Sequence, residues 1–194
     1  MPIIAGRASA AYGAGFGAIT TAPFELVGSY DALASVSLST TTASVTFAGI
    51  PTGYKHLQIR GIQRSDFSGT FVGTTFRFNG DTTSSYAFHN INGNGTAAAA
   101  GANPSVSAID GPTLPAASIT SGIFGGVVAD ILDYNNTSKN KVIRILGGVD
   151  ANGSGNISLR SGLWVNTSAI TSIEIYPGGG SWTQYSQFAL YGVR

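Results

Sequence analysis

Short segments in which apolar and polar residues alternate dominate the chain from about residue 29 onward. In ASVTFAG, Val45 and Phe47 point to one side of an extended strand, and Ser44 and Thr46 point to the other. The segments KHLQIRG and TTFRFNG repeat this period of two, and TTFRFNG ends in Asn-Gly, a common hairpin turn. The pattern predicts β-strands and almost no helix.

The C-terminal half continues the same pattern with longer strands. The run IFGGVVADILDY is so rich in apolar residues that it predicts a central strand covered on both faces, with the loop NNTSKN leading to KVIRILGG as the second strand of a hairpin. The two sides of NISLRSGLW are Ile157, Leu159 and Leu163 against Ser158, Arg160 and Trp164. The segments SIEIYP and SQFALYGV are expected as the last two strands, packing in the core through Ile173, Ile175, Phe188 and Leu190.

Between Thr82 and Ser121 the alternation is lost. This region contains the low-complexity piece NGNGTAAAAGANPS and three prolines, at positions 104, 112 and 115. Such composition predicts a long surface excursion with one or two short strands at most. Outside and within this irregular region, the sequence indicates about eight to ten strands separated by turn signals. This number predicts an all-β fold, an antiparallel β-sandwich of the jelly-roll type.

The first 28 residues differ from the rest of the chain. They are rich in Gly and Ala, carry only Arg7 and Glu25 as charges, and lack a periodic apolar face. Arg7 also interrupts the apolar run that a signal peptide needs. We therefore expect an extended docking arm over residues 1–28 and a β-sandwich body over 29–194. The side chains that would anchor the arm in a partner's pockets are Ile3, Ile4, Tyr12, Phe16, Ile19 and Phe24.

Composition narrows the possible partners. The chain of 194 residues has no Cys, so disulfides, thiolate metal sites and thiol nucleophiles are excluded. Only 10% of the residues are charged, and the basic residues are scattered at a net charge of +1, which argues against a nucleic-acid partner. No apolar stretch approaches the length of a membrane-spanning helix, so a membrane partner is not expected either.

The residues that could support catalysis are few. His56 and His89 are the only histidines, and no nucleophile motif accompanies either of them. His56 falls in a strand pattern on the side opposite Leu57, where a hydrogen-bonded surface imidazole is expected. The closest carboxylates, Asp130 and Asp133, are three residues apart and would lie on opposite faces of a strand. We predict no catalytic residues, no cofactor and no enzymatic activity.

One loop has a weak resemblance to a calcium site. In DANGSGN, Asp150, Asn152 and Ser154 offer oxygen ligands, and Gly155 follows. The pattern then fails, because Ser161 occupies the position at which a bidentate Glu is expected. A hairpin turn rich in Asn and Gly explains the same residues, so we predict no metal here.

Aromatic residues in the C-terminal third suggest a glycan site. Tyr and Trp rings stack on sugar rings in many β-sandwiches, and the loop PGGGSWTQY would display Trp182 to solvent. The candidate glycan-binding residues are Trp164, Tyr176, Trp182 and Tyr185. The alternative is that these rings pack in the core or in subunit interfaces.

Several longer strings resemble a known family. They are IPTGYKHLQIRG, FRFNGDTTSSYAFH, DILDYNNTSKNKVIRILGG, SGLWVNTSAITSI and the ending FALYGVR, together with SAAYGAGFG in the arm. In this order they resemble virion structural proteins of tailed bacteriophages, particularly cyanophages and other aquatic phages. The resemblance implies a component of the virion, often a tail fibre or tail-associated protein, and it supplies no catalytic or site residues.

The position on the particle stays open at this point. A receptor-reading fibre usually needs a long trimeric shaft, and this chain has no heptads or shaft repeats, so a short tail fibre or baseplate appendage is the first expectation. A capsid decoration protein that docks on the major capsid protein is the second. For either role we expect a homotrimer, with a host surface glycan as a further partner. A free carbohydrate-binding module is the contrasting alternative.

Overall fold

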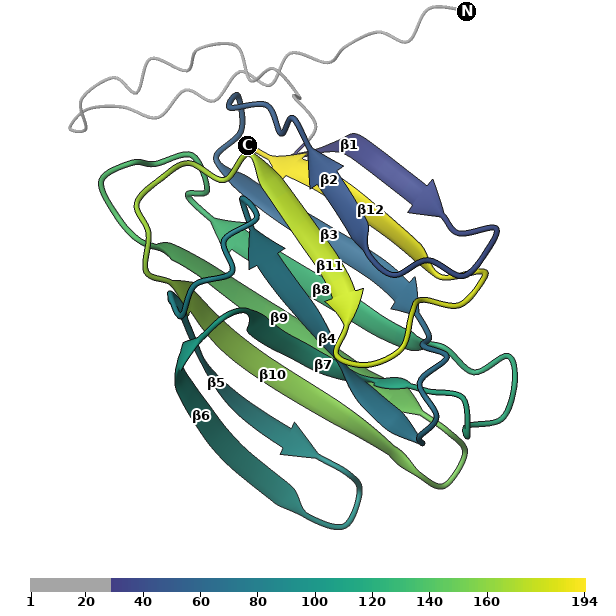
Figure 1. The fold of residues 1–194 in the computed structure, drawn as a ribbon. Helices are drawn as coiled ribbons and strands as arrows, with labels where there is room; N and C mark the ends of the chain where they lie inside the picture. Colours follow the sequence, from purple (N-terminus) through teal and green to yellow (C-terminus); the bar gives the residue numbers. More distant parts are fainter. Residues whose placement is uncertain (1–28) are drawn as a thin grey trace, which may run out of the picture.

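The computed structural model describes residues 29–194, which form twelve β-strands and no helix (Figure 1). The predicted docking arm, with its six anchor residues, lies outside the described residues. The strands are β1 (Tyr30–Ser37), β2 (Val45–Ala48), β3 (His56–Gln63), β4 (Phe71–Phe78), β5 (Tyr86–Gly93), β6 (Ala98–Val106), β7 (Ile109–Pro115), β8 (Gly125–Leu132), β9 (Lys141–Asp150), β10 (Gly155–Trp164), β11 (Ser172–Pro177) and β12 (Gln187–Val193).

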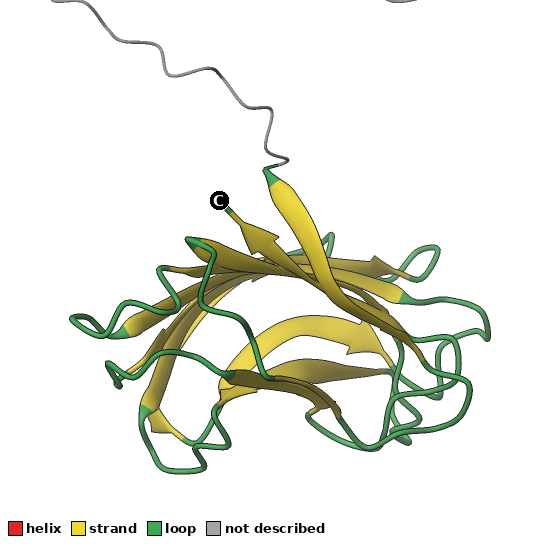
Figure 2. Cartoon of the chain, turned by 90° about the horizontal axis from the view of Figure 1, so that it is seen from above, coloured by secondary structure: helices red, strands yellow, loops and turns green. Residues whose placement is uncertain are grey.

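The strands form two antiparallel sheets that pack face to face as a sandwich (Figure 2). The larger sheet has eight strands in the order β1-β12-β3-β8-β9-β10-β5-β6. The smaller sheet has four strands in the order β2-β11-β4-β7. The predicted all-β sandwich is therefore confirmed.

The topology of the sandwich is a jelly roll with two added hairpins. The strands β1, β12, β3 and β8 form one four-stranded half of the roll, and β2, β11, β4 and β7 form the other. The hairpins β5–β6 and β9–β10 are inserted into this plan. Both insertions join the same edge of the same sheet, which doubles its width while the other sheet stays narrow.

The core lies between the sheets and consists of the inward-pointing residues of both. Successive residues of a strand point to opposite faces of the sheet, so every second residue points into the core. Ile173 and Ile175 of β11 and Phe188 and Leu190 of β12 all belong to this core, as predicted. The indole of Trp182 packs at 5.0 Å, centroid to centroid, from the ring of Phe188.

The prediction for the region Thr82–Ser121 was wrong. It contains three strands, β5, β6 and β7, where one or two short ones were expected. The prolines that argued against strands lie in β6 and β7, which are both edge strands. An edge strand tolerates proline, because one side of its backbone has no hydrogen-bonding partner in the sheet.

The prediction that β8 is covered on both faces was also wrong. The strand is central, between β3 and β9, and forms the predicted hairpin with β9. Its burial nevertheless alternates, with Val127 and Ile131 buried and Val128 and Leu132 exposed. The smaller sheet covers the inward face of β8, and within residues 29–194 nothing covers the other.

The loop weighed as a calcium site is a tight hairpin turn between β9 and β10. The amide of Ala151 donates to the carbonyl of Ser154 at 2.7 Å, and the amide of Asn152 donates to Oδ1 of Asp150 at 2.8 Å. Asn152 and Gly153 have φ angles of 56° and 108°, which Asn and Gly tolerate best. The turn interpretation is confirmed.

Candidate functional site: the outer face of the larger sheet

The most unusual surface of the protein is the face of the larger sheet that points away from the smaller one, which we call the outer face. Eight large apolar side chains are exposed there, although a monomeric protein seldom leaves so many together in water. They are Ile62, Ile91, Val128, Leu132, Val142, Leu146, Ile157 and Leu159. Their exposed fractions run from 39% to 63%.

Strand register places four of these side chains side by side. Val128 of β8 is paired with Leu146 of β9, Leu146 with Leu159 of β10, and Leu159 with Ile91 of β5. Directly paired residues have Cβ atoms about 4.5–5.5 Å apart, so the four side chains form a continuous band across four strands. We call this band the apolar row. It crosses from the jelly roll into both inserted hairpins.

A second level of the outer face is lined by glycines and is hollowed. Here Gly126 of β8 is paired with Gly148 of β9, and Ile62 and Ile157 flank them on the neighbouring strands. A Cβ atom at Gly126 would meet nothing within 4 Å, so this position opens onto free space. The absent side chain of Gly126 leaves a depression in this row, between Ile62 and Ile157.

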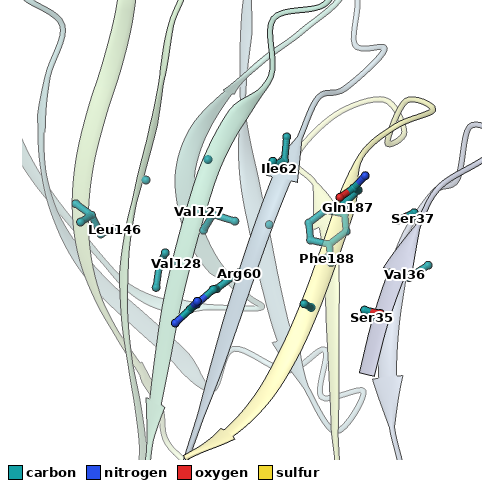
Figure 3. A pocket seen from close by; sticks show the side chains of 14 residues that line it. Ser35, Val36, Ser37, Arg60, Ile62, Val127, Val128, Leu146, Gln187 and Phe188 are labelled. Carbon is teal, nitrogen blue, oxygen red and sulfur yellow. The ribbon is translucent and has the colours of Figure 1, made fainter. Parts of the chain in front are cut away.

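Two hollows meet at this level and form one groove, which we call the glycine groove. The first has a volume of about 630 Å³ and extends from β1 to β9, past Arg60, Ile62, Val128 and Leu146 (Figure 3). The second, of about 720 Å³, continues toward the β9–β10 turn and the end of β5. Gly126, Leu146 and Gly147 line both, so the groove runs across the strands of the sheet.

A third level of the outer face is polar, and its charges are largely paired. The carboxylate of Asp130 accepts hydrogen bonds from Gln58 Nε2 at 2.7 Å and from Arg144 Nη2 at 3.1 Å. Arg60, which is paired with Val128 in the neighbouring row, donates from Nε to Gln58 Oε1 at 2.7 Å, and its guanidinium lies 5.0 Å from the ring centroid of Tyr191. This level can therefore form hydrogen bonds with a partner, and it carries no large excess of positive or negative charge.

Two of the four predicted glycan-binding aromatics belong to the core. The indoles of Trp164 and Trp182 are 1% and 0% exposed. Trp182 Nε1 donates to the carbonyl of Ile175 at 3.1 Å, so its polar edge is used inside the protein. The expectation that the loop PGGGSWTQY displays Trp182 is wrong. The backbone of Trp182 forms isolated β-bridges with Thr42 and Ser65, and its indole is buried.

The two tyrosines of that set are in different environments. Tyr176 is partly buried, and its hydroxyl accepts a hydrogen bond from Arg77 Nη2 at 2.8 Å. Burial raises the pKa of Tyr176. Tyr185 is 67% exposed and has a φ of 71°. No ring contact among residues 29–194 joins any two of the four aromatics, so they form no common platform.

The two histidines are in different settings. His56 Nδ1 accepts a hydrogen bond from the amide of Asp133 at 3.0 Å, so the predicted hydrogen-bonded imidazole is confirmed. The ammonium of Lys139 donates to Asp133 and holds the pKa of that carboxyl below its usual range. His89 lies beside Ser161 on the outer face, but no hydrogen bond links the two side chains in the described part of the chain. This pair lacks the geometry of a nucleophile and its base.

Residues 29–194 contain no group of three or more His, Cys, Asp or Glu side chains placed to hold a metal ion. In the same part of the chain, no helix is long and apolar enough to cross a membrane. No protein-family model, curated protein or solved structure matches the chain.

The residues of the outer face were not predicted as a site from the sequence. The side of β10 that carries Ile157 and Leu159 was recognised as apolar, yet it faces outward, while Ser158 and Arg160 face inward. A signal was present in the sequence: apolar residues occupy both sides of β8 and β9, and only one side of a strand in a two-layer sandwich can be buried.

Proposed function

We propose that the chain is a non-enzymatic structural protein of a tailed-bacteriophage virion. In this proposal the β-sandwich is a subunit that joins neighbouring virion proteins, and residues 1–28 are the docking arm. A short tail fibre or baseplate appendage is the first assignment, and a capsid decoration protein is the second. The subunit is proposed to self-associate as a homotrimer.

The observation that carries the assembly part of this proposal is the apolar outer face. A stable interface buries about 800 Å² on each partner. Eight strands spaced about 4.8 Å apart, with about eight residues of 3.3 Å each, make a face of roughly 1,000 Å². The outer face therefore has the size and the apolar centre that a stable protein–protein contact requires.

The phage part of the proposal has a different basis. It rests on the resemblance of five body segments and the arm to virion proteins of tailed phages. The jelly roll is compatible with this role, since the fold recurs in capsid and binding domains, but it is shared by proteins of many functions. The low content of charged residues, 10%, suits a surface that is covered in an assembly.

The decisive experiment locates the chain on purified particles. Cryo-electron microscopy of intact virions is expected to show the sandwich at the tail or on the capsid, and this distinguishes the two assignments. Phages that encode a chain lacking residues 2–28 should produce a folded body that is absent from particles. Finding no sandwich on the virion, or full incorporation without the arm, would overturn the proposal.

Host-glycan binding is a second candidate function, supported by one observation. Of the four aromatics considered for it, Tyr185 alone presents most of its ring to solvent. A glycan array probed with the full chain and with Tyr185→Ala tests this role. A signal that disappears in the variant supports adhesion, and an unchanged signal or a silent array removes Tyr185 as a sugar platform.

A further inference from the structure

We propose that the glycine groove of the outer face is the acceptor for the N-terminal arm, residues 1–28, of a neighbouring copy of the chain. This inference rests on the proposed role in assembly and names the surface that the arm contacts. Its support comes from the lining of the groove, the apolar row beside it and the direction of β1.

The shape of the groove fits an extended polypeptide. Gly126 and Gly148 lie side by side on its floor, and the missing side chain of Gly126 leaves free space in which another backbone can approach closely. Ile62 and Ile157 lie in the same row as these glycines, on the strands to either side, and Leu146 lines both halves of the groove. The groove is thus lined mainly by glycine and apolar residues, which suits a chain of small residues with occasional large apolar ones.

The composition of the arm matches this lining. Its sequence is mostly Gly, Ala and other small residues, with large apolar side chains at intervals and only two charges, Arg7 and Glu25. Small residues suit the glycine floor, whereas Tyr12 and Phe16 are large enough to pack against the exposed side chains of the apolar row. A highly charged segment would lose hydration on such a surface, where few charged side chains are available to pair with it.

The length of the arm is sufficient. From β1 to β5 the groove crosses six strand spacings, or about 29 Å at 4.8 Å each. An extended chain covers this distance with about nine residues at 3.3 Å per residue. The remaining residues of the arm span up to about 60 Å, which is enough to connect two adjacent bodies.

The direction of β1 favours a neighbouring copy as the donor of the arm. The groove begins beside Ser35 and Ser37, near the end of β1. The arm joins at the start of that strand, where Tyr30 is paired with Val193. The arm is therefore attached at the end of β1 that points away from the groove, and the arm of the same copy would have to turn back to reach it.

Cross-linking of the full chain tests the proposal, and the absence of native cysteine makes an introduced thiol unique. Gly126→Cys places a thiol in the groove, where a Cβ meets no atom within 4 Å. Gly73→Cys is the matched control, because Gly73 lies on β4 of the smaller sheet and its Cβ would also meet nothing within 4 Å. Each thiol is labelled with a benzophenone maleimide and mixed with isotope-labelled wild-type chain before irradiation.

The expected product links Gly126→Cys to residues 1–28 of the isotope-labelled copy, with a clearly lower yield from Gly73→Cys. A link to the β-sandwich of the labelled copy would show face-to-face packing and overturn the arm as occupant. Links confined to the variant's own arm would overturn the neighbouring copy as donor. Equal yields at the two positions, or no link at Gly126→Cys, would overturn the groove as the acceptor.

A filled groove provides a second test. Gly126→Trp is expected to weaken self-association about tenfold or more without changing thermal unfolding, whereas Gly73→Trp leaves both unchanged. Association that is unaffected by Gly126→Trp contradicts the proposal. Both tests use purified protein, so they succeed or fail independently of whether the chain is found on virions.

Discussion

The indole of Trp164 donates a hydrogen bond from Nε1 to Oδ2 of Asp81 at 2.7 Å, which connects the end of β10 to the turn after β4. The same carboxylate accepts hydrogen bonds from the hydroxyls of Ser85 and Thr83, each at 2.6 Å. These donors, with Ser85 contributing most, hold the pKa of Asp81 well below its usual range.

We predict that Asp81 makes the fold sensitive to acid. A carboxyl whose pKa is lower in the folded state stabilises the protein above the unfolded-state pKa of about 3.9, and this contribution is lost as the pH falls below it. Urea unfolding between pH 7 and pH 2.5 should show the loss. Asp81→Asn should destabilise the protein at pH 7 by about 1–3 kcal/mol and flatten the pH dependence below pH 4. An equally steep acid limb in the variant would contradict this role.

The buried ammonium of Lys141 should be important for stability. Its Nζ donates to the carbonyls of Asn136, Lys139 and Thr167 at 2.7, 2.8 and 2.8 Å, so it joins two loops, and burial lowers its pKa. Lys141→Met leaves three carbonyls without this donor and should reduce the free energy of unfolding by about 2–4 kcal/mol. Lys139→Met, at an exposed ion pair, is the control and should cost less than about 1 kcal/mol. Similar losses of stability in Lys141→Met and Lys139→Met would contradict a special role for the buried Lys141 ammonium.

Truncation of two consecutive residues of β9 should affect the stability of the fold to very different extents. Ile145 is fully buried, whereas Leu146 is 51% exposed in the apolar row. Ile145→Ala should cost about 2–5 kcal/mol of unfolding free energy, measured by chemical denaturation. Leu146→Ala should change the stability of the monomer by no more than about 0.5 kcal/mol. A large loss for Leu146→Ala in monomeric protein would mean that its side chain is covered within the same chain.

A charge placed in the apolar row should reduce self-association. Leu159 is paired with Leu146 and Ile91, so Leu159→Glu puts a carboxylate in the middle of the proposed contact. Sedimentation velocity should show about a tenfold or larger rise in the dissociation constant with little change in thermal unfolding. Thr41→Glu, in the exposed loop before β2, is the control for added negative charge. An oligomer that is unchanged by Leu159→Glu would place the interface elsewhere.

The glycine in the middle of β10 is required by packing. A Cβ atom at Gly162 would lie 2.7 Å from Ile109 Cγ2 and 2.8 Å from Ile143 Cγ2, both in the core. Gly162→Ala should therefore destabilise the protein by about 1–3 kcal/mol. Gly126→Ala, which meets nothing within 4 Å, should be neutral or slightly stabilising. A calorimetric comparison of the two variants checks this, and equal melting temperatures would contradict it.

Much of the fold could be predicted from local patterns. The alternation in β2, β3, β4, β11 and β12 identified these strands, because residues on the covered face of a sheet must be apolar at every second position. The turn at Asn152 was also recognisable, since a residue with positive φ is most often Gly or Asn. The strands β6 and β7 were missed, because Ala, Gly and Pro carry little strand signal and the pairing of each strand with a neighbour decides its conformation.

The candidate site was less predictable, as Trp182 illustrates. A Trp between glycines and serines has the composition of an exposed loop, yet the backbone of Trp182 pairs with Thr42 and Ser65, far away in the sequence, and its indole is buried. Burial depends on these long-range contacts, so composition alone assigned Trp182 to the wrong environment.

By itself, the sequence determined which residues share a side of each strand. The period of two is a property of the extended backbone, so Ile157 and Leu159 necessarily lie together, opposite Ser158 and Arg160. Only the tertiary structure decided which side is covered. Two hairpins inserted at different points of the chain widen one sheet, and the narrow second sheet packs against one of its faces. Within residues 29–194 the apolar residues on the other face are left uncovered.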